Sequence, residues 1–117
     1  MQYLLMIYSA EDAGPQPGTE AFMKMLGEYQ SFNDETQNDG VYVAGEPLES
    51  INTATTVRVR NGQQEITDGP FAETKEALGG FYLLDCENLD EAIAYAAKIP
   101  TAAYGSIEIR PIMNLSD

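Results

Sequence analysis

The stretch Tyr3-Leu4-Leu5-Met6-Ile7-Tyr8 carries an apolar or aromatic side chain at every position. Successive side chains of a strand point to opposite faces of a sheet, so this run predicts a strand that is covered on both sides. Phe81-Tyr82-Leu83-Leu84 has the same pattern and predicts a second central strand. These two runs decide the fold, because they require a sheet with other structure packed on each face.

Two helical patterns can cover one face of that sheet. Thr19 is a predicted N-cap for a helix over residues 19–39 that ends at Gly40. Apolar side chains recur in it at helical spacing: Phe22, Met25, Leu26, Tyr29 and Phe32. Asn88, followed three residues later by Glu91, resembles a capping box and predicts a second helix that stops before Pro100.

Shorter β patterns complete the order of elements. Residues 41–45 predict a strand that Glu46-Pro47 ends or bends. Residues 56–60 and 63–67 flank Asn61-Gly62, a pair typical of a two-residue hairpin turn, and Gly79-Gly80 leads into the second central strand. Strict alternation over 106–110 predicts the last strand. The chain therefore reads as one α+β domain over residues 1–117, with a ferredoxin-like βαββαβ plan and an inserted β-hairpin.

The apolar outer face of the central strands predicts a homodimer. Two helices cover only one face of the sheet, whereas residues 3–8 and 81–84 are apolar on both faces. An uncovered face would leave an apolar patch of the size that marks interfaces, and a second copy of the same sheet is the simplest cover.

Composition excludes several classes of function. Nineteen acidic residues against six basic ones give a formal net charge of -13, which repels nucleic acids and anionic membranes. The chain has no histidine, so Ser-His and Cys-His nucleophiles and the commonest metal ligand are missing, and we expect no metal and no cofactor. Its one cysteine, Cys86, is predicted to pack in the core. No export or membrane signal is visible at the N-terminus, so the cytoplasm is the expected location.

The stretch Asp68-Gly69-Pro70-Phe71-Ala72-Glu73-Thr74-Lys75-Glu76 combines a turn with three carboxylates and one ammonium group. It resembles the DGPFAETKE signature of the YCII-related superfamily. Residues 3–8, 55–60, 79–84 and 99–111 also resemble that family.

The resemblance implies a dimeric α/β barrel of ferredoxin-like halves. Most proteins of the family have no established reaction, and some are encoded beside sigma factors of the extracytoplasmic-function group, which implies a regulatory or accessory role. Relatives are thought to use a His-Asp pair, and a few act on small aromatic compounds. Without histidine, only Asp68 matches that pair.

Two interpretations of the charged residues stay open. Asp68 is a candidate general base or hydrogen-bond anchor, or else a cap of its own turn. Glu73 could orient a substrate or tune Asp68, or else lie in a solvated segment. Arg58 and Arg60 share one hairpin face and could grip a carboxylate or phosphate, or else neutralise neighbouring carboxylates.

Aromatic side chains supply the remaining candidates. Tyr8, Phe71 and Tyr104, together with Phe81, are predicted to line a pocket, unless they belong to the core. Two functions follow. One is an enzyme acting on a small anionic or aromatic molecule, with Asp68 as acid or base. The other is a non-catalytic ligand-binding or accessory module linked to transcriptional regulation.

Overall fold

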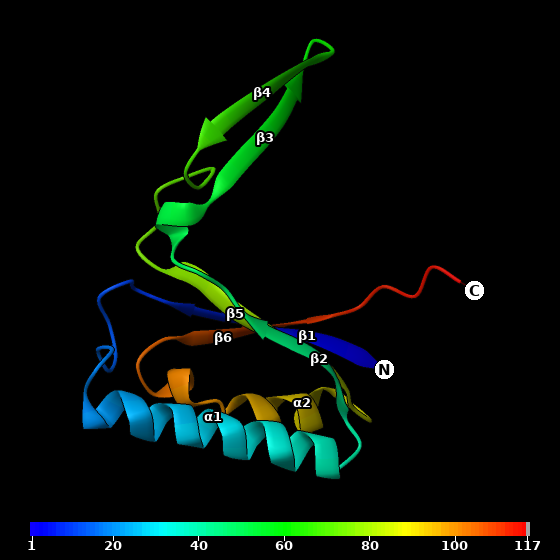
Figure 1. Ribbon diagram of the computed structural model, residues 1–117. Helices are drawn as coiled ribbons and strands as arrows, with labels where there is room; N and C mark the ends of the chain where they lie inside the picture. Colours follow the sequence, from blue (N-terminus) through cyan, green and yellow to red (C-terminus); the bar gives the residue numbers. More distant parts are fainter. Residues whose placement is uncertain (117) are drawn as a thin grey trace.

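Four strands form one antiparallel sheet in the order β2-β5-β1-β6. Their bounds are β1 Gln2–Ser9, β2 Tyr42–Pro47, β5 Ala77–Asp85 and β6 Ser106–Pro111. In the computed structural model, which describes residues 1–116, the two strands predicted to be central, β1 and β5, are the inner pair (Figure 1). The chain is thus a mixed α+β protein whose strand order and antiparallel pairing are compatible with a ferredoxin-like fold.

Both helices lie on one side of the sheet (Figure 1). They are α1, Glu20–Asn38, and α2, Leu89–Ala96, and a 3₁₀ turn, η2, Pro100–Ala103, connects α2 to β6. The predicted caps are confirmed: the Thr19 hydroxyl accepts a hydrogen bond from the backbone N–H of Phe22, and the Asn88 side chain accepts one from Glu91 N–H. The Glu91 carboxylate bonds back to the N–H of Glu87.

The two faces of the inner strands differ in burial. The side chains of Tyr3, Leu5, Ile7, Tyr82 and Leu84 face the helices and are 0–8% exposed. Side chains that alternate with them are only half-buried, because no helix lies on that side: Leu4, Met6, Phe81 and Leu83. Cys86 is 2% exposed, which confirms its predicted place in the core.

β2 ends at Pro47, as predicted, and it can hold a proline there because it is an edge strand, where a missing N–H can face away from the ladder. One detail differs from the sequence prediction. Gly79 and Gly80 lie inside β5. A Cβ at Gly80 would lie 3.0 Å from the carbonyl oxygen of Glu46, so glycine allows β2 to approach closely.

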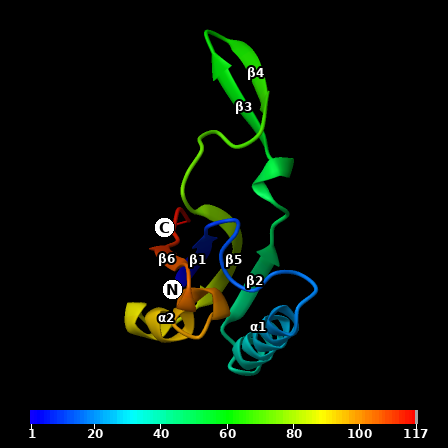
Figure 2. The ribbon, with the colours of Figure 1, turned by 90° about the vertical axis from the view of Figure 1, so that its left-hand side faces the viewer.

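A second, two-stranded sheet consists of β3, Thr55–Arg60, and β4, Gln63–Asp68. The connecting residues Asn61 and Gly62 have φ of 54° and 75°, as a type I′ turn requires. A short 3₁₀ turn, η1, Ile51–Thr53, precedes β3. Figures 1 and 2 show this β3–β4 hairpin rising from the sheet on the side opposite the helices. The radius of gyration is therefore 16.3 Å, above the roughly 13 Å of a compact domain of this length.

Candidate functional site

A pocket of about 350 Å³ lies between α1 and the helix-facing side of the sheet. Its volume falls in the range of small-molecule sites, which is about 300–1,000 Å³. Three strands, α1 and η2 contribute its lining: Ile7, Ser9, Met25, Leu26, Tyr29, Asn33, Tyr42, Gly45, Glu46, Pro47, Gly79, Gly80, Phe81, Tyr82 and Thr101.

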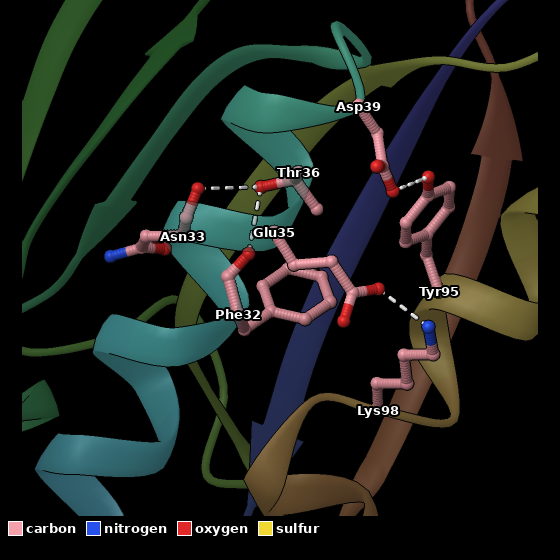
Figure 3. Close-up of polar contacts among 7 residues, drawn as sticks. All are labelled: Phe32, Asn33, Glu35, Thr36, Asp39, Tyr95 and Lys98. Atoms are coloured by element: carbon pink, nitrogen blue, oxygen red, sulfur yellow. Dashed lines mark hydrogen bonds and ion pairs between the residues drawn. The ribbon is translucent and has the colours of Figure 1, made fainter.

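Hydrogen bonds on both sides hold α1 over this pocket. On the pocket side, the Tyr82 hydroxyl of β5 donates to Asn33 Oδ1 of α1 at 2.6 Å. On the other side, the Tyr95 hydroxyl of α2 donates to Asp39 Oδ2 at 2.6 Å, and Lys98 pairs with Glu35 (Figure 3). The Lys98 pair is solvent-exposed and contributes about 0–1 kcal/mol. The Tyr95 bond is exposed as well, so the part-buried bond between Tyr82 and Asn33 is the strongest of these polar contacts.

The ring of Tyr82 forms one wall and depends on a glycine for its place. A Cβ at Gly45 would lie 2.6 Å from Tyr82 Cδ1, so a larger residue there would displace the ring. Phe32 packs edge-on against the ring with centroids 4.8 Å apart. Burial raises the pKa of the Tyr82 phenol above its ordinary value, so the hydroxyl stays protonated at neutral pH and acts as a donor.

A chain of hydroxyl groups lies at the η2 side of the pocket. The Tyr29 hydroxyl is 2.5 Å from Thr101 Oγ1, which lies 3.4 Å from the Tyr104 hydroxyl. Tyr104 in turn donates to the sulfur of Met25 at 3.2 Å. Burial raises the pKa of Tyr29 as well. The pocket therefore offers neutral hydroxyl groups that can donate or accept hydrogen bonds.

The electrostatic character of the pocket follows from one carboxylate. Glu46, which is solvent-exposed, is the only charged side chain in the lining, and no lysine or arginine of the described residues joins it. The amide nitrogen of Asn33 makes no hydrogen bond to any of residues 1–116 and is a free donor. A ligand would meet aromatic and aliphatic walls and neutral polar groups, with no cation to balance a negative charge.

Of the aromatic residues predicted to line a pocket, Phe81 is in the lining, but its side chain alternates with that of Tyr82 and lies on the sheet face without helices. Tyr8 is not in the lining. It lies between Ile7 and Ser9 in β1, which both line the pocket, and its hydroxyl contacts the sulfur of Met6 at 3.9 Å. Phe71 is 73% exposed. Tyr104 is outside the lining but reaches it through its contact with Thr101.

The predicted acidic residues lie at the base of the hairpin. Asp68 is the last residue of β4, pairs with Thr55, and is exposed. Its carboxylate forms no hydrogen bond with any of residues 1–116; the turn is held instead by Gly69 N–H, which donates to Ala54 O at 2.7 Å, and by the Thr56 hydroxyl, which donates to Gly69 O at 2.8 Å. Glu73 is also exposed.

The predicted arginines contact backbone carbonyls. Arg58 Nη2 donates to Phe71 O at 3.1 Å, and Arg60 Nη1 donates to Val59 O at 3.2 Å. Within residues 1–116, neither guanidinium group forms an ion pair. The structure thus keeps Arg58 beside the turn after Asp68 and brings neither arginine to the pocket lining, so their role in binding stays a prediction.

Sequence reasoning missed the polar residues of the pocket, Asn33, Tyr82 and Thr101, as functional candidates. One signal was available: Gly45 in a predicted strand marks a close approach of another group, here the Tyr82 ring.

Residues 1–116 contain no group of three or more acidic or cysteine side chains that could hold a metal ion. No helix in the same range is long and apolar enough to cross a membrane.

Comparison with known proteins places the chain in a family. A solved structure of 5-chloro-2-hydroxyhydroquinone dehydrochlorinase (TftG) from Burkholderia phenoliruptrix AC1100, in complex with 2,5-dihydroxybenzoquinone, matches with a TM-score of 0.48 and 14% identity over 97% of this chain and 94% of that chain. An uncharacterized protein of Rhizobium meliloti (strain 1021) is 33% identical over 114 residues, which are 96% of this chain and 92% of that protein. The model of the YCII-related domain matches residues 1–116. Because that match spans every residue but the last, the chain belongs to the YCII-related family.

Proposed function

We propose that this chain binds a small, neutral aromatic molecule in the pocket between α1 and the sheet. The observation that carries the proposal is the composition of the lining: aromatic and aliphatic walls, the hydroxyls of Tyr29 and Tyr82, and the free amide nitrogen of Asn33, without a lysine or arginine among the described lining residues. Such a site buries a flat apolar ring and orients it through a few polar groups.

The same groups favour binding over acid-base catalysis. Because the pKa values of Tyr29 and Tyr82 are raised, both phenols stay protonated and neither serves as a base near neutral pH. Glu46 is the one lining carboxylate, and it is exposed at the edge strand. A non-catalytic ligand-binding module would suit the regulatory or accessory role expected from the family resemblance.

Charge supports a neutral ligand over an anionic one. A net charge of -13 and the lone Glu46 at the pocket disfavour an anion. The matched probes are 4-hydroxybenzamide and 4-hydroxybenzoate, which have the same shape and differ in charge. At a concentration tenfold above its Kd, the amide should raise the free energy of unfolding by about 1.4 kcal/mol, and the benzoate should bind more weakly.

A variant that fills the pocket provides the control. Leu26 lines the pocket from α1, whereas Met23 lies on the same helix outside the lining and is 66% exposed. Leu26→Trp should abolish the stabilisation by 4-hydroxybenzamide, and Met23→Trp should retain it. If both variants bind the amide as the wild type does, or if the benzoate binds more tightly, the pocket proposal is wrong.

We also propose that the protein is a homodimer, in which the uncovered sheet faces of two copies meet as in a dimeric α/β barrel. The support is the half-buried apolar side chains on the face without helices: Leu4, Met6, Phe81 and Leu83. A two-fold axis would pair each patch with its own copy. Sedimentation equilibrium at micromolar concentration should give twice the 12.8 kDa chain mass, and a monomer at all concentrations would contradict the proposal.

A further inference from the structure

The β3–β4 hairpin has one apolar face with no cover. Val57 pairs with Ile66, and Val59 lies two residues further along β3, so the three side chains share a face. Val57 is 58% exposed, Ile66 is 61% exposed and Val59 is 62% exposed. In Figures 1 and 2 the hairpin stands clear of both helices and of the four-stranded sheet.

The opposite face of the hairpin contacts its own chain only at the base. The Thr56 hydroxyl donates to Gly69 O and Arg58 donates to Phe71 O, so the segment that follows β4 lies against that part of the face. The hairpin is also well formed, with six paired positions and a turn of the required geometry. An isolated two-stranded hairpin is marginally stable in water, and its bare apolar face invites a partner.

We propose that the hairpin is an arm that clasps the second copy of the chain, with Val57, Val59 and Ile66 packed on that copy. The inference rests on the homodimer proposed above. Two observations select a second copy as the occupant: the direction of the hairpin and its reach.

The direction and the reach follow from the fold. The hairpin rises on the side of the sheet without helices, which is the side where the partner sheet would lie (Figure 1). Packed sheets lie about 10 Å apart. A strand of six residues, such as β3, spans about 20 Å, so the arm extends past the level of a partner sheet and along its flank.

The first test measures dimer dissociation by sedimentation. Val57→Thr combined with Val59→Thr keeps β-branched side chains and removes apolar contact, and we expect the dimer Kd to rise on the order of tenfold or more. Gln63→Thr, on the opposite hairpin face, is the matched control and should stay within twofold of the wild type. If the wild type is a dimer and the double variant has the same Kd, the arm proposal is wrong and the dimer proposal is retained. A monomeric wild type overturns both.

The second test does not depend on the stability of a weakened variant. Val59→Cys is labelled with a benzophenone maleimide, because Cys86 is buried and should not react, and a mixture with isotopically heavy unlabelled protein is irradiated. Light-heavy cross-linked peptides are expected, with the attachment point on the second copy. Cross-links only within one chain, or none at a concentration where sedimentation shows the dimer, overturn the inference.

Discussion

Replacing Tyr82 by phenylalanine tests the contact that holds α1 over the pocket. The substitution keeps the buried ring, its edge-on contact with Phe32 and its seat against Gly45, and removes only the hydroxyl that donates to Asn33 Oδ1 at 2.6 Å. The residue is 6% exposed, so the hydrogen bond is largely shielded. A net loss of about 1–2 kcal/mol in the free energy of unfolding is expected for such a bond.

Tyr42→Phe is the matched control. Its hydroxyl reaches Gly45 O at 3.4 Å, a distance at which little hydrogen-bond energy remains, and the residue is half-buried beside the same Tyr82 ring. We expect a loss below about 0.5 kcal/mol. The difference between the two variants therefore isolates the bond from the general cost of removing a phenol hydroxyl.

A double-mutant cycle with Asn33→Ala measures the coupling itself. Urea denaturation of the wild type, both single variants and the double variant should give a coupling energy of about 1 kcal/mol. With a slope of about 2 kcal/mol per molar urea, Tyr82→Phe should lower the midpoint by roughly 0.5–1 M. A coupling within about 0.3 kcal/mol of zero, or equal losses for Tyr82→Phe and Tyr42→Phe, would show that this bond does not position α1.

Three further changes have definite expected outcomes. Gly45→Ala should destabilise the chain by about 1–3 kcal/mol, measured by urea midpoint, because its Cβ would lie 2.6 Å from the Tyr82 ring; an unchanged midpoint would mean that the ring moves freely. Burial raises the pKa of the Cys86 thiol from 9.0 to about 11, and the negative charge of Glu91 adds to this rise. The folded state then keeps a proton that the unfolded state loses, so stability should fall by about 2 kcal/mol as pH rises from 9 to 11, and Cys86→Ala should remove that part of the slope. Asp68→Asn and Asp68→Ala should each change stability by less than about 0.5 kcal/mol, because the carboxylate is exposed and unbonded within residues 1–116; a loss of 4-hydroxybenzamide binding in Asp68→Asn would instead support a role in the site.

Much of the fold follows from local pattern and from pairs of residues close in sequence. The inner strands were predictable because residues 3–8 and 81–84 are apolar on both faces, and both helix starts were predictable because Thr19 and Asn88 cap them through bonds only three residues long. The exception is a backbone position set by tertiary contact: Gly80 lies within β5, where the lack of a side chain lets Glu46 of β2 approach it.

The pocket could not be predicted in the same way, because its contacts join residues that are distant in sequence. Tyr82 meets Asn33 across 49 positions, and Tyr29 meets Thr101 across 72. Periodicity indicated that Tyr29 belongs to an apolar helical stripe, but a stripe does not specify which hydroxyl it will meet. The charged stretch after β4 was the conspicuous feature of the sequence, and most of its charged side chains are exposed to solvent.

The contrast between these two regions bears on ligand choice. Burial of a charged side chain costs hydration energy, which only a charged or hydrogen-bonding partner offsets. With only six basic residues for 19 acidic ones, few carboxylates in this chain can find such a partner. Apart from the exposed Glu46, the polar side chains that line the pocket are accordingly neutral: phenols, an amide and hydroxyl groups. Burial raises the pKa of Tyr29 and Tyr82, so both phenols are neutral at neutral pH. An anionic ligand would face the same desolvation cost without a cation to offset it, whereas a neutral ring with one or two polar substituents would find both walls and hydrogen-bond partners. The scarcity of basic residues thus affects the pocket as well as the protein surface, and it favours a neutral ligand.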